Sequence, residues 1–259
     1  MKRWICIIFS LICCIIVKGI ELEVNVLSTP EELDLSNDKL CVLPGKGLFV
    51  ISGNTVFSLE GKSEISRIEL LDTSEISHFM FLKDRFIYKA KNKICSYMDK
   101  AKVEYQFENE NFEYYPSRED SLFIVRTEKD TSYVYGLKLG EDALKPILCI
   151  PDSIIGVYGS VNNLTLATKS RIYGYTNKKP EILFSTVEDI RSIIFTPFGI
   201  LFCSPEGLFR VISINQYLAL ASGGIKQLLY DGEIIYALTD SGYILSLSEA
   251  TQYIKKPYY

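Results

Sequence analysis

Short apolar runs separated by polar turns recur along most of this chain. Residues 226–248 read KQLLYDGEIIYALTDSGYILSLS, in which three apolar runs are broken by DGE and TDSG. Runs of this length between turn signals, rich in Ile, Leu, Val, Tyr and Phe, predict β-strands. Many of the runs are apolar at consecutive positions rather than at alternate ones. Both faces of such strands must be covered, which predicts sheets that stack face to face.

The same three-run unit occurs six times. The units lie at 39–60, 78–98, 112–139, 155–176, 192–213 and 226–248, and their second runs begin near residues 48, 86, 122, 164, 200 and 234. A looser fourth run follows several units, as in EISRIELL (64–71), KPILCI (145–150), EILFS (181–185) and QYLALA (216–221). Four strands in a repeat of about 37 residues predict blades that stack radially and cover each other's faces.

These units resemble the repeats of the β-propeller superfamily, and most of all those of the short-repeat six-bladed and PQQ-type propellers. The resemblance implies an all-β fold, a six-bladed β-propeller of four-stranded antiparallel blades whose ring is closed by an N-terminal strand on the last blade. The repeats carry no WD dipeptide, and the only tryptophan is Trp4, so the docking tryptophan of PQQ-type repeats is missing. Tyr173, Tyr243 and Phe57 are expected to take its packing role. A pair of β-sandwiches is the alternative fold.

The first 19 residues, MKRWICIIFSLICCIIVKG, have the layout of a secretory signal peptide. Lys2 and Arg3 give a basic start, residues 4–17 are almost wholly apolar, and cleavage is expected after Gly19. A retained signal anchor is one alternative, and lipidation at Cys14 is another. The protein is therefore expected to be extracytoplasmic, in a periplasm, in the ER lumen or secreted.

The rest of the chain is expected to divide into a closing strand with a short turn (20–37) and the propeller (38–259). The stretch IELEVNVLS (20–28) alternates apolar and polar residues, which is typical of a half-buried edge strand. It is expected to pair with the outer side of the last blade, around residues 252–256. STPEEL (28–33) is expected to form a capped helical turn.

The charge of the chain argues against several partners. Removal of residues 1–19 takes away three basic residues and leaves 25 basic against 32 acidic ones, a net charge of −7. An acidic protein of this kind is a poor candidate for nucleic-acid or anionic-lipid binding. No nucleic acid is therefore expected as a partner, and membrane contact is expected only if the N-terminal segment is retained or lipidated.

Few residues offer catalytic chemistry. His78 is the only histidine, and beside Phe79 it is expected to be a structural residue. The cysteines of the chain after Gly19 contain no C-x-x-C pair and are expected to be free, buried thiols. They are Cys41, Cys95, Cys149 and Cys203.

Metal binding has no clear signal in the inner runs. In gluconolactonase-type propellers, acidic residues and Asn in the central channel hold a divalent ion. The corresponding runs here are CVLP, FMFL, EYYP, GVYG, IIFT and QLLY, and Glu113 is their only acidic residue. No cofactor and no catalytic or metal-binding residue is therefore assigned, although carboxylates in loops leave a calcium site open.

The candidate binding residues are Phe112, Tyr114, Tyr115, Arg118 and Glu119. They belong to FENENFEYYPSRED (107–120), which is interpreted as a widened inner hairpin. Tyr and Arg are residue types that anchor protein interfaces. The alternative is that both tyrosines pack against the channel or against a neighbouring blade.

The expected function is therefore a protein-binding or scaffold module in an extracytoplasmic complex, with another protein as its partner. Whether it is an enzyme stays uncertain, and a binding protein is favoured. The alternatives are a divalent-ion-dependent propeller hydrolase or lactonase, and a propeller that binds a small molecule or a glycan.

Overall fold

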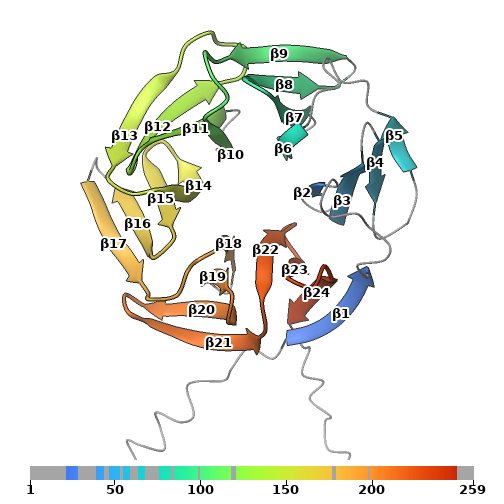
Figure 1. The fold of residues 1–259 in the computed structure, drawn as a ribbon, viewed down its shortest axis with the longest axis vertical. Coiled ribbons are helices and arrows are strands. Elements are labelled where there is room, and N and C mark those ends of the chain that lie inside the picture. Colours follow the sequence, from blue (N-terminus) through green and yellow to red (C-terminus); the bar gives the residue numbers. More distant parts are fainter. Residues whose placement is uncertain are drawn as a thin grey trace, which may run out of the picture.

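The computed structural model describes residues 22–28, 39–43, 47–52, 55–58, 64–67, 76–82, 85–98, 100–117, 121–176, 179–197 and 199–249. In these residues, 24 strands form six four-stranded antiparallel sheets that surround a central axis (Figure 1). No helix among them is long and apolar enough to cross a membrane.

Five of the sheets are blades, each made from one continuous stretch of chain. The first two blades are β2 (Lys39–Leu43), β3 (Gly47–Ser52), β4 (Thr55–Ser58) and β5 (Glu64–Arg67), followed by β6 (Ile76–Leu82), β7 (Arg85–Ala90), β8 (Lys93–Tyr97) and β9 (Ala101–Gln106). The third is β10 (Glu113–Pro116), β11 (Ser121–Glu128), β12 (Thr131–Lys138) and β13 (Lys145–Ile150). The fourth and fifth are β14 (Ile154–Ser160), β15 (Asn163–Thr168), β16 (Arg171–Thr176) and β17 (Lys179–Ser185), then β18 (Ser192–Thr196), β19 (Gly199–Ser204), β20 (Gly207–Ser213) and β21 (Gln216–Ser222).

The remaining sheet, which we call the composite sheet, joins the two ends of the chain. Its strands are β22 (Ile225–Tyr230), β23 (Ile235–Thr239), β24 (Ile244–Glu249) and β1 (Leu22–Ser28). β1 runs antiparallel to β24, with Leu22 opposite Glu249 and Ser28 opposite Ile244. The ring in Figure 1 is therefore closed by a strand from the N-terminal end of the chain.

The prediction that residues 38–259 contain six complete four-stranded blades is wrong. In the described part of that stretch there are five complete blades and three further strands. β1 supplies the fourth strand of the composite sheet, so it belongs to the ring rather than adding to a finished blade. It pairs with β24, because β24 offers an open edge that only an extended segment can satisfy. β1 pairs with residues 244–249 and not with the expected segment around 252–256. Of the expected turn at 28–33, only Ser28 is described, and it ends β1.

Hydrophobic cores lie between neighbouring sheets. One core joins Cys41 and Phe49 of the first blade to Phe86 of the second, and equivalent clusters occupy the other junctions around the ring. The composite sheet packs through Tyr236 against Leu48 of the first blade. Because each sheet has a neighbour on both faces, consecutive side chains of one strand are buried in different cores. This explains the apolar runs that do not alternate.

Tyr114 shows how tightly these junctions are packed. It belongs to β10 of the third blade, and its side chain is fully buried. Its hydroxyl donates a hydrogen bond to the backbone oxygen of Ile87 in the second blade, at 3.1 Å. Burial raises the pKa of the Tyr114 phenol well above its ordinary value. The neutral side chain thus acts as a cross-link between two blades.

Removal of the closing strand is expected to destabilise the whole ring. Deletion of residues 20–28 exposes the edge of β24, so the melting temperature should fall by about 10 °C or more, with aggregation. A synthetic peptide of residues 20–28, added in excess, should restore the melting temperature in a calorimetric scan. A peptide of the same composition in scrambled order is the control. If the protein without residues 20–28 has the same melting temperature as the full chain, pairing of β1 with β24 does not stabilise the ring.

Tyr114→Ala is expected to lower the free energy of unfolding by about 3–5 kcal/mol, because it leaves a cavity between two blades. Tyr114→Phe keeps the ring but leaves the Ile87 oxygen without this donor, which should cost about 1–3 kcal/mol. Denaturant unfolding measures both values. Tyr243→Ala is the matched control, since the Tyr243 side chain is 41% exposed. Equal stability of the Tyr114 and Tyr243 variants would contradict this packing role.

Candidate ligand channel

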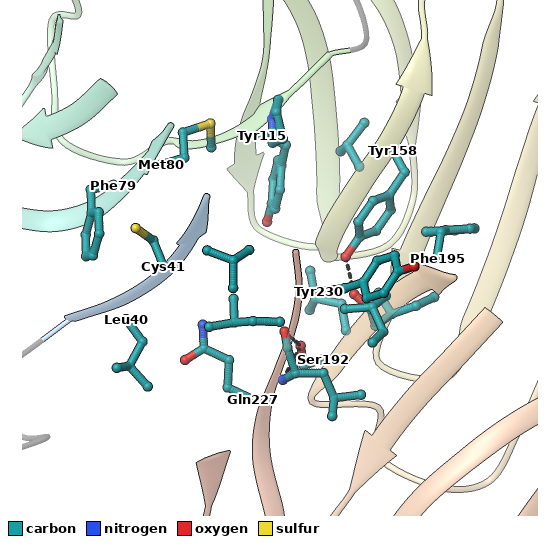
Figure 2. Close-up of a pocket in the computed structure, with 18 of the residues that line it drawn as sticks. Leu40, Cys41, Phe79, Met80, Tyr115, Tyr158, Ser192, Phe195, Gln227 and Tyr230 are labelled. Carbon is teal, nitrogen blue, oxygen red and sulfur yellow. Dashed lines mark hydrogen bonds between the residues drawn. The ribbon is translucent and has the colours of Figure 1, made fainter. Parts of the chain in front are cut away.

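A cavity of about 810 Å³ lies where the innermost strands of all six sheets converge. β2, β6, β10, β14, β18 and β22 each contribute to its wall. Figure 2 shows side chains from these strands facing one another across the open space. The lining residues named in the figure are Leu40, Cys41, Phe79, Met80, Tyr115, Tyr158, Ser192, Phe195, Gln227 and Tyr230. A cavity of this size is in the range of small-molecule sites.

The wall of this channel is mainly apolar. Many of its side chains are only half-buried, since one side packs in a core and the other faces the channel. They include Leu40, Val42, Met80, Phe81, Ile155, Phe195 and Leu229. Half-exposed apolar side chains around a concave space are typical of a site that binds an apolar group.

Three hydroxyl groups of the wall are already held by backbone atoms. The Tyr158 hydroxyl donates to the backbone oxygen of Ile193, and the Tyr230 hydroxyl donates to that of Gly232 at 2.6 Å. The Ser192 hydroxyl accepts from the backbone nitrogen of Leu228 at 3.1 Å. These bonds fix the side chains in place, so the polar part of the wall is pre-organised.

Burial keeps the channel tyrosines in their neutral form. Desolvation raises the pKa of Tyr115 and Tyr158, and the neighbouring Glu113 carboxylate raises the pKa of Tyr115 further. Desolvation and the carboxylates of Asp231 and Glu233 also raise the pKa of Tyr230. The phenols are therefore hydrogen-bonding groups here and not bases at neutral pH.

The structure separates the predicted binding residues. Phe112 and Tyr114 are buried between the second and third blades. The Phe112 ring stacks on Phe107 with centroids 3.9 Å apart, and its backbone oxygen accepts from the Lys89 ammonium at 2.6 Å. Tyr115 instead lines the channel.

Arg118 and Glu119 lie outside the described residues. The run EYYP (113–116), predicted as an inner run, is the inner strand β10, which pairs with β11. The alternative interpretation, in which both tyrosines pack against the channel or a neighbouring blade, therefore describes Tyr114 and Tyr115.

The other candidate residues are spread over the molecule. His78 lies in β6 opposite Lys89, and its side chain is outside the described part of the structure. Glu113 is exposed at the start of β10. Within the described residues, no group of His, Cys, Asp and Glu side chains has the arrangement of a metal site. No metal-ligating set can therefore be named.

The cysteines are free, as the sequence predicts, but they differ in exposure. Cys41, Cys95 and Cys203 are buried, whereas Cys149 is exposed. Burial raises the pKa of the Cys203 thiol to about 12 and raises that of Cys41, which lines the channel. These two thiols are therefore protonated, inert packing groups at neutral pH.

The third-strand aromatics do not share the packing role predicted for them. Tyr173 packs against the core between the third and fourth blades, but Tyr243 is exposed in the turn before β24. The Phe57 side chain lies outside the described part of the structure. Of the two described positions, Tyr173 packs against a core and Tyr243 does not.

The apolar channel residues were not predicted as a site. Leu40, Met80, Phe195 and Leu229 looked like ordinary strand residues, since their runs are apolar throughout. A usable signal was present nonetheless. The first run of each unit forms the innermost strand, so its residues are the ones that meet at the axis.

Comparisons with known proteins identify the architecture. No protein-family model matches the chain, and no curated protein matches it. Among solved structures, a putative gluconolactonase is similar with a TM-score of 0.63 and 11% identity, covering 88% of this chain and 92% of that one. Regucalcin, a calcium-binding protein from Agrobacterium tumefaciens, gives 0.62 and 10%, covering 88% and 94%. Virginiamycin B lyase from Staphylococcus aureus gives 0.60 and 12%, covering 88% and 99%. Identities this low show the fold alone, so the chain is a β-propeller for which no narrower family is assigned.

Proposed function

We propose that this protein is an exported binding propeller whose ligand site is the central channel. The observation that carries the proposal is the cavity of about 810 Å³ with half-buried apolar side chains from all six inner strands. Water in such a space has few partners, so an apolar ligand that displaces it gains free energy. The fixed hydroxyls of Tyr158, Ser192 and Tyr230 keep the wall in shape before the ligand arrives.

A second form of the proposal is that the module docks another protein in an extracytoplasmic complex. The supporting observation is a group of exposed apolar residues on the outer rim, which we call the rim patch: Ile182, Leu183, Ile212 and Ile214. Ile214 follows β20, and its backbone oxygen accepts from the Ser185 nitrogen of β17 at 2.7 Å, so the two segments lie side by side. Exposed apolar side chains on neighbouring segments of this kind can serve as a protein interface.

A divalent-ion-dependent hydrolase or lactonase is the competing proposal. Its support is the similarity of fold to the putative gluconolactonase and to regucalcin. Near-stoichiometric calcium in the purified protein, together with a melting temperature that falls on chelation, would favour it over a binding propeller.

Filling the channel is expected to abolish binding of an apolar ligand. A neutral naphthylamine dye should bind the protein with a rise in fluorescence. Ile155→Trp or Met80→Trp should weaken this binding about tenfold or more, because the indole occupies the space. Ile212→Trp, on the exposed rim, should bind the dye like the native protein.

Calorimetry should confirm that each variant is folded. Dye affinity unchanged in both channel variants would show that the dye binds elsewhere and would contradict the channel as the site.

Charges in the rim patch are expected to disrupt docking without unfolding the protein. Leu183→Glu combined with Ile214→Glu should remove a stoichiometric partner from cross-linked, affinity-captured samples of the native cells. Exposed positions change stability little, so the melting temperature should hardly move. Met98→Glu combined with Val103→Glu is the matched control, because both residues are exposed and apolar but lie on the second blade. A partner retained by the rim variant would contradict docking through this patch.

A further inference from the structure

The inner strand β22 carries a bulge at one end of the channel. Ile225 pairs with Thr239 and Gln227 pairs with Leu238, so Lys226 is an extra residue that pairs with no residue of β23. Bulges bend a strand and redirect side chains, and they are common beside functional sites. Here Lys226 and Gln227, which follow one another in the chain, both line the cavity.

The same irregularity occurs at the start of β14. Ile154 pairs with Thr168 and Gly156 pairs with Ala167, which leaves Ile155 as the extra residue. Ile155 also lines the cavity, and it is apolar. The bulge position thus faces the channel in two different sheets, and in β22 it carries a positive charge.

Lys226 is the only charged residue among those that line the cavity in the described part of the chain. The Lys226 ammonium is exposed, and no ion pair or hydrogen bond joins it to another described residue. The Gln227 side chain is half-buried, and within the same residues its amide has no hydrogen-bond partner either. The Gln227 amide is open to the channel and is not a buried unpaired group, so its N–H groups are available to a ligand without breaking a bond inside the protein.

We propose that the channel binds an apolar carboxylic acid, with its carboxylate against Lys226 and Gln227 and its hydrocarbon body along the apolar wall. A carboxylate only accepts hydrogen bonds, and the ammonium and the amide N–H groups donate them. Charge-assisted bonds of this kind are stronger than neutral ones. This inference rests on the proposed function, because it names the ligand class of the same channel.

The test uses a fluorescent long-chain carboxylic acid and its methyl ester, titrated into the purified protein. The acid should bind about fivefold to tenfold more tightly than the ester, because only the acid carries the charge that Lys226 attracts. Lys226→Gln should weaken binding of the acid by that factor and leave the ester unchanged. Added salt should weaken the acid alone. Lys169→Gln, which removes an exposed lysine away from the channel, is the matched control.

The outcomes separate the two proposals. If the ester binds as tightly as the acid, and Lys226→Gln changes neither, the carboxylate inference is wrong while the apolar channel still stands. If neither probe binds the native protein, the channel is not a ligand site and both proposals fail. If Lys226→Gln and Lys169→Gln weaken the acid equally, the effect is one of net charge, and the site at Lys226 is disproved. Gln227→Leu should weaken the acid more than the ester, which checks the amide independently.

Discussion

Burial of both faces of every sheet is the constraint on which this structure depends. Each sheet has a hydrophobic core on either side, so no sheet is stable without its two neighbours, and the neighbours can satisfy one another only by forming a closed ring. Within the described residues, Tyr114 and Tyr236 are extreme cases, since large aromatic side chains are entirely enclosed between sheets. The ring thus follows from the apolar residues on both faces of each sheet. At its axis the inner strands surround a cavity instead of packing against one another.

The channel follows from the same constraint. Inner strands turn their faces toward the cores, and only their edges and half-buried side chains remain at the axis, so an apolar wall arises without any residue being placed there for chemistry. Binding is the function that such a wall supports most directly, because a ligand replaces poorly bonded water. The polar groups that could give this channel specificity lie in one short segment, Lys226 and Gln227. A bulge in β22 brings a cation and an amide together at one end.

The sequence predicts the strands better than their partners. Second runs placed at residues 48, 122 and 200 lie within one residue of the starts of β3, β11 and β19, because turn residues and apolar runs mark strand ends locally. The alternating pattern of residues 20–28 indicates an edge strand, but no local pattern encodes its register, and the structure pairs it with residues 244–249 rather than with the expected segment around 252–256. Tyr114 is buried between two blades and Tyr115 lines the channel, because neighbours on a strand point to opposite faces. This difference and the bulge at Lys226 depend on strand register, which the sequence pattern does not specify.

The composite sheet also fixes the order in which the molecule can be completed. Among the described strands, β1 is made first and β24 last, yet they are hydrogen-bonded neighbours. The first strand therefore cannot pair with β24 until more than 200 later residues have been made, from Ser28 to Ile244. Blades formed from continuous chain can assemble earlier, in sequence order. The edge of β24 stays open until β1 docks against it, so closure of the ring is the step that joins the earliest described strand to the latest one.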